Sequence, residues 1–178
     1  TLLHDDVIDE STKRRGKATA NLLWDNKSSI LVGDYLFAKS FELMVETDSI
    51  KVLESLSSAS ARISESEIIQ LSKINDIKLS YDKYIEIIEG KTASLFSAAC
   101  EVGGIISNAS NDEIKYLKKY GNSIGLGFQI IDDLLDYSGN KKLGKNTGDD
   151  FREKKITLPV ILFLKKNKKD TINFWNKT

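Results

Sequence analysis

The feature that most constrains the fold is a helical stretch at residues 121–137 whose second half gathers acidic residues. At about 100° per residue, Asp132 and Asp136 lie within ~40° of each other on one face of this helix. The same stripe continues toward the N-terminal end through Gln129, Phe128, Gly125 and Gly121. The other face is apolar and is predicted to pack against a core; it carries Ile124, Ile130, Ile131, Leu134 and Leu135. The glycines predict empty volume below the carboxylates.

Paired carboxylates at this spacing are costly in a purely structural helix. Like charges at i and i+4 repel one another, and aspartate is a poor helix former. A cation between Asp132 and Asp136 relieves the repulsion. Oxygen ligands suit a hard ion such as Mg²⁺, which uses one or two carboxylates together with phosphate oxygens. The alternative is a solvated acidic patch at a helix end.

The acidic pattern occurs a second time, at the start of the chain. Asp5 and Asp9 share a helix face there, with Asp6 beside them. Each cluster follows an apolar helical run and precedes a basic segment. The basic residues are Lys13, Arg14 and Arg15 after the first cluster and Lys141, Lys142 and Lys145 after the second. Two acidic clusters, each followed by cations, favour a metal-bridged polyanion such as a diphosphate over a solvated patch.

Composition indicates the fold class. The chain has 178 residues, enough for one domain with a core, and only one proline, which with long 3.6-residue periodicity predicts an all-α fold. Its 26 basic and 26 acidic residues balance, so nothing points to nucleic acid. No apolar run approaches ~18 residues, so no transmembrane span is expected. The single cysteine, Cys100, excludes an internal disulfide and suits a reducing compartment.

Helical periodicity divides the chain into helices joined by polar connections. We expect helices at residues 1–9, from Ser28 or Ser29 to Glu46, at 48–72 opening with Asp48, from Asp82 to Ile106, and from Asn111 to Tyr137. Residues 10–27, 73–80 and 138–158 are predicted loops. Pro159 fits the first turn of a following helix. Glu67 and Gln70 are assigned to the surface or to an interface.

On these motifs the chain resembles the trans-type isoprenyl diphosphate synthases, the polyprenyl synthetase family, and most closely the long-chain, octaprenyl-like members. The first signature is DDVIDESTKRRGKAT, and the second is GFQIIDDLLDYSGN followed by GKNTGDDFREKKITLP. Weaker matches between them are VGDYLF, SESEIIQL and GKTASLF. The similarity spans residues 1 to about 163.

The resemblance implies a helical bundle around a deep central cavity, of the class I isoprenoid synthase type. It implies a cytoplasmic homodimer that uses Mg²⁺ to condense isopentenyl diphosphate head-to-tail with an allylic diphosphate. It also implies that residues 1–178 form a single polyprenyl synthetase domain that is incomplete. On this expectation, helices are missing at both ends, together with an upstream basic segment.

The same resemblance implies roles for individual residues. Expected metal ligands are Asp5, Asp6, Asp9, Asp132, Asp133 and Asp136, with Asp6 and Asp133 in supporting positions. Expected diphosphate contacts are Arg14, Arg15, Lys91, Lys145 and Lys155, while Thr92 and Gln129 add hydrogen bonds near the scissile end. Asp5, Asp9, Asp132 and Lys91 form the expected catalytic set. Lys154 stands where the family commonly has glycine, and Lys155 keeps the family's spacing from Thr157-Leu158-Pro159.

This chemistry needs no protein nucleophile. His4, the only histidine, lies beside Asp5 on an otherwise apolar turn and is interpreted as structural. Cations stabilise the departing diphosphate, and the alkene of isopentenyl diphosphate attacks the allylic cation that remains. In the family, the released diphosphate takes the proton. An apolar pocket protects the cation from water, and the growing chain is expected to pass Gly125 and Gly121.

Three other functions remain open on the sequence. A terpene cyclase or head-to-head synthase shares the acidic motifs, although the RRG and GKNTGDD segments argue against it. A regulatory subunit of a heteromeric synthase usually loses one acidic motif, and this chain keeps both. A calcium-binding scaffold is remote because a helical DDxxD lacks the loop glycine and alternating ligands of an EF-hand.

Overall fold

The computed structural model describes residues 1–138 and 148–167, and helices account for most of them. In order, the elements are α1 (Leu2–Ile8), β1 (Lys13–Arg14), β2 (Lys17–Ala18), α2 (Ala20–Leu23), α3 (Asn26–Glu46), α4 (Ile50–Ser72), α5 (Tyr81–Ile88), the π-helical turn η1 (Glu89–Ala93), α6 (Ser94–Ile106), α7 (Asn111–Asp136), α8 (Asp149–Arg152) and α9 (Leu158–Lys166). The predicted all-α class is confirmed. Within the described residues, no helix is both long and apolar enough to cross a membrane.

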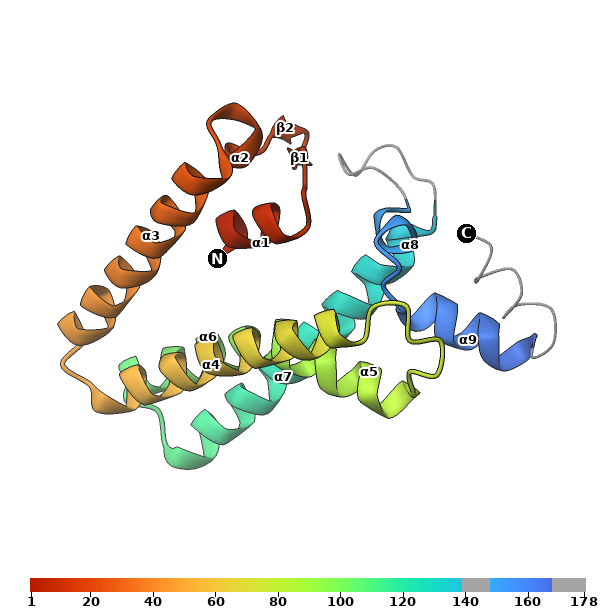
Figure 1. Cartoon of the computed structure of the whole chain (residues 1–178). Helices are drawn as coiled ribbons and strands as arrows, with labels where there is room; N and C mark the ends of the chain where they lie inside the picture. The colour runs from red at the N-terminus through yellow and green to blue at the C-terminus, as the bar shows by residue number, and fades with distance from the viewer. Residues whose placement is uncertain (139–147, 168–178) are drawn as a thin grey trace.

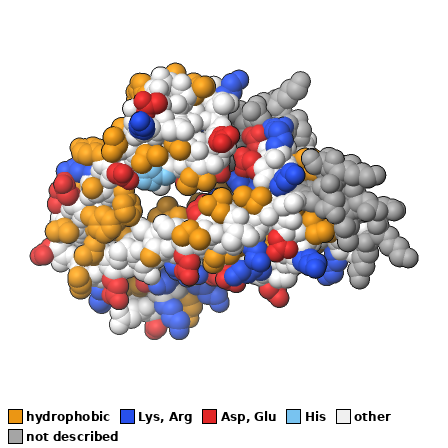
Figure 2. All heavy atoms as spheres, in the orientation of Figure 1, with side chains coloured by type: hydrophobic (Ala, Val, Ile, Leu, Met, Phe, Trp, Pro, Cys, Tyr) orange, Lys and Arg blue, Asp and Glu red, His pale blue; other side chains and the backbone are white. Residues whose placement is uncertain are grey.

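The long helices form two parts joined at the α3–α4 turn (Figure 1). Helices α4, α6 and α7 pack side by side, with η1 against both α4 and α7. Helix α3 leans away from this layer, and α1 lies along α3 on the side that faces α7 and α8. Figure 2 shows this face hollowed beneath α1, between α3 and α4, with apolar side chains around the opening. The hollow corresponds to the predicted central cavity.

A compact apolar cluster holds the far end of α7 in place. Tyr84 and Ile88 of α5 pack there with Ile156, Val160 and Ile161 from the α9 region, and Ile130 of α7 lies against them. Pro159 stands in the first turn of α9, as predicted, where its missing N–H costs nothing. The cluster therefore fixes the second acidic motif relative to α5 and α9.

The helix ends show how well the sequence predicted the boundaries. Helix α3 begins at Asn26 with Asp25 as its cap, which accepts from the backbone N–H of Ser28, so the choice of Ser28 or Ser29 was wrong. Helix α5 is capped by Ser80, with Asp82 in the first turn. Ser110 caps α7 in a reciprocal capping box with Glu113, and Asn111 is the first helical residue. Such small displacements are the usual uncertainty of a helix end.

Residues 10–27 are not the irregular loop that was predicted. They contain the hairpin β1–β2, in which Lys13 pairs with Ala18, and the short helix α2. Arg15 and Gly16 form the two-residue turn with φ of 52° and 77°, and two positive φ values are what a tight hairpin of this type requires. Strands of two residues leave no periodic pattern in the sequence.

The apolar face of α7 is the largest correction. Of the five residues predicted to pack, Ile124, Ile131 and Leu134 are exposed, whereas Ile130 packs against the α5–α9 cluster as predicted. The buried residues of α7 are Gly121, Gly125 and Asp133, so the helix packs through the face that carries the glycines. Their lack of a side chain lets the backbone of α7 approach η1 and α6 closely, and this close approach selects the packed face.

The glycines therefore do not leave the empty volume that was predicted below the carboxylates. A Cβ on Gly121 would lie 2.4 Å from the carbonyl oxygen of Phe96, and one on Gly125 would lie 2.5 Å from the Cα of Ala93. Contacts this short mean that backbone fills the space.

Candidate functional site

The first acidic motif lies on the short helix α1 and its C-terminal cap, Asp9, and its three carboxylates have different surroundings. Asp6 is buried, and its Oδ1 accepts from the Nε of Arg14 at 2.7 Å. This ion pair links the hairpin β1–β2 to α1. Asp5 and Asp9 are half-buried on the neighbouring face, as the spacing predicted. Asp6 is therefore enclosed, whereas Asp5 and Asp9 remain partly exposed.

His4 anchors α1 to α3. Its Nε2 lies 3.1 Å from the carbonyl oxygen of Ile30 and 3.2 Å from Oδ1 of Asp34. Gly33 makes room for the ring, because a Cβ at that position would lie 2.3 Å from the same nitrogen. The structural interpretation of His4 fits this arrangement. The His4 contacts fix the direction in which the next residue, Asp5, projects.

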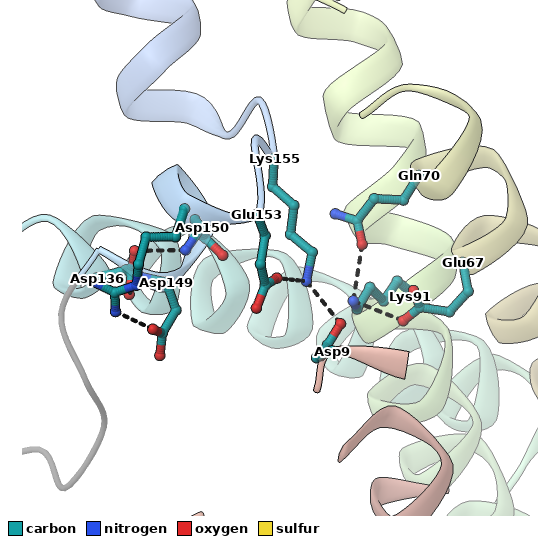
Figure 3. A network of polar contacts seen from close by, with 10 residues as sticks. Asp9, Glu67, Gln70, Lys91, Asp136, Asp149, Asp150, Glu153 and Lys155 are labelled. Atoms are coloured by element: carbon teal, nitrogen blue, oxygen red, sulfur yellow. Dashed lines mark hydrogen bonds and ion pairs between the residues drawn. The ribbon is translucent and has the colours of Figure 1, made fainter. Parts of the chain in front are cut away.

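The π-helical turn η1 directs the side chains of two neighbouring residues toward two different helices. Lys91 reaches α4, where its Nζ lies 2.7 Å from Oε1 of Glu67 and 2.9 Å from Oε1 of Gln70 (Figure 3). Thr92 reaches α7, where its hydroxyl donates to Oε1 of Gln129 at 2.6 Å. Such π turns widen a helix by one residue and often occur at functional sites.

Glu67 and Gln70, which were assigned to the surface or to an interface, contact Lys91 in the structure. Both are half-buried and hold the ammonium group of Lys91. Their i, i+3 spacing on α4 placed them on one face, and that was the available signal. The sequence did not show which face of α4 meets Lys91, because that depends on the packing of α4 against η1.

The second acidic motif ends α7. Asp132 is half-buried. Asp133 is buried and accepts from the hydroxyl of Tyr84 and from Nε2 of Gln129, both at 2.7 Å. The carboxylate of Asp136 accepts from the backbone N–H groups of Asp149 and Asp150 at 3.3 and 3.2 Å, so it closes the N-terminus of α8.

Lys155 joins the beginning of the chain to its last third. Its Nζ lies 3.0 Å from Oδ1 of Asp9 and 2.6 Å from Oε2 of Glu153 (Figure 3). Burial disfavours the ammonium, but these two carboxylates outweigh burial and raise the pKa of Lys155. Lys154 has a φ of 55°, which explains why glycine is common at that position in the family the sequence resembles. This turn directs Lys155 back toward α1.

The remaining expected phosphate contacts are Arg15 and Lys145. Arg15 is exposed at the tip of the hairpin. Lys145 lies outside the described residues, as do Lys141 and Lys142. The basic groups that the structure brings to the carboxylates are Arg14, Lys91 and Lys155.

The electrostatics of the site show an excess of negative charge. Burial raises the pKa of Asp5, and the charges of Glu67 and Asp9 raise it further, while Lys91 opposes them. Lys91 also acts on Asp133, where burial again raises the pKa. One ammonium group therefore lies within range of both acidic motifs. Burial and the charges of Asp133 and Asp136 raise the pKa of Asp150 to about 7.

These surroundings fit a divalent cation that is completed by a ligand. In the described part of the chain, no three acidic, histidine or cysteine side chains form a ready-made metal cage. Asp5 and Asp9 nevertheless repel each other in a half-buried place, and their oxygen-only chemistry suits a hard ion. Mg²⁺ typically takes one or two carboxylates and fills its other positions with water and phosphate oxygens, so a full protein cage is not required.

The fold and the site together define a class of protein. It is a mainly helical protein in which two helices carry acidic motifs, and lysine side chains lie near these motifs around one hollow. The chain belongs to the polyprenyl synthetase family, whose model matches residues 1–177. It is 48% identical over 162 residues to an octaprenyl diphosphate synthase of Escherichia coli K12, covering 90% of this chain and 50% of that protein. The chain spans about half the length of the curated relatives it matches.

Solved structures agree with this assignment. A polyprenyl synthase from Caulobacter crescentus, complexed with calcium and isoprenyl diphosphate, has a TM-score of 0.95 at 50% identity, covering 99% of this chain and 54% of that one. A decaprenyl diphosphate synthase from Rhodobacter capsulatus has a TM-score of 0.91 at 56% identity, covering 98% and 54%. The predicted family and isoprenoid synthase fold are confirmed.

Proposed function

We propose that the full-length protein is a trans-polyprenyl diphosphate synthase, a transferase that condenses isopentenyl diphosphate with an allylic diphosphate. The observation that carries the proposal is the connection between the two acidic motifs: Lys155 contacts Asp9 at 3.0 Å, and Asp136 accepts from the backbone of the segment that leads to Lys155. The charge of Lys91 also acts on the pKa of Asp5 and of Asp133. Carboxylates from two helices, with ammonium groups near both, suit a metal-bridged diphosphate. The similar polyprenyl synthase from Caulobacter crescentus is complexed with calcium and isoprenyl diphosphate, which supports this choice.

We assign the metal-facing role to Asp5 and Asp9 on α1 and to Asp132 with Asp136 on α7. Mg²⁺ bound there supplies positive charge to the departing diphosphate. Asp6 and Asp133 act as supporting groups, since both are buried and bonded to Arg14 or to Tyr84 and Gln129, whereas the other acids of the motifs are only half-buried.

The cationic side chains bind the diphosphate in this proposal. Lys91 and Lys155 are held by carboxylates in the structure, and a bound diphosphate offers both ammonium groups stronger acceptors. Arg15 and Lys145 extend the set, and Arg14 contributes from the hairpin. Thr92 and Gln129 form a hydrogen-bonded pair near the scissile end.

The apolar hollow beneath α1 excludes water from the allylic cation and accommodates the growing chain. We include a single-domain organisation, a homodimer and a cytoplasmic location in the proposal. Exposed apolar residues along α3, among them Leu31 and Tyr35, support an association through that helix.

The test is product analysis of the full-length protein with farnesyl and isopentenyl diphosphates. We expect Mg²⁺-dependent chain extension that is abolished by a chelator. Asp5→Ala and Asp132→Ala should each lower kcat by about 10²-fold or more, because each removes charge stabilisation from the leaving group. Asp82→Ala, an exposed acid in the first turn of α5, is the matched control and should leave kcat unchanged.

Two results would contradict the proposal. Unchanged turnover in Asp5→Ala or Asp132→Ala would remove the site assignment. Conversion of the allylic diphosphate alone, without uptake of isopentenyl diphosphate, would favour a cyclase.

A further inference from the structure

Four side chains form a continuous hydrogen-bonded line beneath the proposed site. It starts at Tyr84 of α5, passes through Asp133 and Gln129 of α7, and ends at Thr92 of η1. The three donor–acceptor distances are 2.7, 2.7 and 2.6 Å. Tyr84 is 2% exposed and Asp133 is 5% exposed, so water competes little for these groups. Tyr84 itself is distant from Thr92: eight helical residues separate them, which is about 12 Å along the axis.

The line has a fixed direction. Both partners of Asp133, the Tyr84 hydroxyl and the Gln129 amide nitrogen, are donors, as an ionised carboxylate requires. Because Nε2 of Gln129 faces Asp133, its Oε1 faces Thr92. That oxygen only accepts, so Thr92 must donate its single hydroxyl proton to it. Turning the amide over would place an acceptor against the carboxylate and leave a buried group unsatisfied.

We propose that Tyr84 and Asp133 are positioning residues that set the orientation of Gln129 and Thr92, and that Asp133 does not bind metal. Thr92 then offers only lone pairs to a bound substrate, which leaves the direct phosphate contacts to the lysine and arginine side chains. Asp132, the neighbouring residue, lies about 100° away around the helix and keeps the metal role. This inference rests on the proposed function, since it concerns the same site.

A double-mutant cycle in the full-length protein tests the line. We expect Tyr84→Phe to lower kcat by about tenfold or more, since a shift of about 1 Å in a positioned group is costly. Thr92→Val should also lower kcat. In the Thr92→Val background, Tyr84→Phe should add less than about threefold, although sites more than about 10 Å apart usually contribute additively. Tyr81→Phe, an exposed tyrosine on the same helix, is the control and should change kcat by less than about twofold.

Calorimetric binding of Mg²⁺ with inorganic diphosphate supplies a readout independent of turnover. Asp133→Asn is isosteric and should keep the apparent Mg²⁺ affinity within about threefold of the parent, whereas Asp132→Asn should weaken it by about tenfold or more. Equal weakening by both variants would make Asp133 a ligand and overturn the inference. Melting temperatures identify variants that lose stability alone.

The outcomes also separate this inference from the proposed function. If the parent protein binds Mg²⁺ with diphosphate but does not extend an allylic diphosphate, the proposed function fails, and the Asp133 comparison still decides whether that residue is a ligand. Two outcomes with an active parent would show that the positioning role is wrong. In one, Tyr84→Phe and Thr92→Val lower kcat additively. In the other, Tyr84→Phe lowers only the melting temperature.

Discussion

At the residue scale, small side chains decide how closely the helices meet. Gly33 admits the ring of His4, and Gly121 and Gly125 admit the backbone of α6 and η1. In each position a single Cβ would create a contact that only a movement of the neighbouring ring or backbone relieves. These glycines therefore place α1 and α7, which carry the two acidic motifs, without contributing any functional group.

Gly125→Ala tests this close approach. The added Cβ would lie 2.5 Å from the Cα and 2.9 Å from the Cβ of Ala93, so η1 or α7 must move. Overpacking of this kind costs about 1–3 kcal/mol of unfolding free energy, more than alanine returns as a better helix former. Gly127→Ala, on the same helix with nothing within 4 Å, should instead stabilise by up to about 1 kcal/mol. Urea denaturation measures both, and equal effects would contradict the packing account.

Particular residues show what could be predicted from the sequence at this scale. The acidic spacing predicted Asp5 and Asp9 on one face, since a helix fixes such spacing locally, and both are half-buried in the structure. The prediction of empty volume at Gly121 and Gly125 was wrong. A glycine in a helix is compatible both with open space and with the close approach of a neighbouring backbone, and the sequence does not distinguish the two. The contacts of Glu67 with Lys91 and of Tyr84 with Asp133 join residues on different helices, and no single-helix pattern contains that information.

At the element scale, the helices were predicted because their period repeats over many residues. The hairpin at 13–18 and the turn η1 were not, because each is too short to establish a period. A π turn differs from an α-helix by one extra residue, so the predicted helix to Ile106 continued through it. That extra residue rotates Lys91 and Thr92 toward α4 and α7, and the site depends on it.

The capping box of α7 predicts a specific pH dependence of stability. Hydrogen bonds from the Ser110 side chain and backbone lower the pKa of Glu113 below its usual value of 4.5. A lowered folded-state pKa means that the stabilisation is complete above the unfolded pKa and is lost as pH falls through the folded value. Glu113→Ala should therefore destabilise the protein at pH 7, and the difference should shrink below about pH 4.

Urea midpoints of Glu113→Ala and Glu113→Gln at several pH values make the comparison. Glutamine retains the reciprocal cap without a titrating proton, so its stability relative to the parent should not depend on the same ionisation. A Glu113→Ala difference that stays constant from pH 7 to below pH 4 would show that the ionised cap contributes nothing.

At the scale of the whole molecule, the site is held together by contacts between distant parts of the chain. Asp9 and Lys155 are 146 residues apart and meet at 3.0 Å. Helix α1 otherwise packs on α3 and α2, so this ion pair is a direct link between the first motif and the segment that follows α8. A ligand that binds both motifs would bridge the same two parts of the molecule.

Such a bridge should be detectable in the melting temperature, because the stabilisation by diphosphate should depend on Mg²⁺ and the stabilisation by Mg²⁺ should depend on diphosphate. Inorganic diphosphate with Mg²⁺ at about 100 times the dissociation constant should stabilise the full-length protein by about 2.7 kcal/mol and raise the melting temperature by several degrees. Either component alone should give a smaller shift, because the carboxylates repel an anion until the metal neutralises them. Asp5→Ala and Asp132→Ala should each remove most of the shift in melting temperature. A single intact acidic motif binds the metal–diphosphate complex much more weakly than two motifs together. If one variant keeps the whole shift in melting temperature, the acidic motif that carries the substitution takes no part in binding, and the diphosphate lies against the other motif alone.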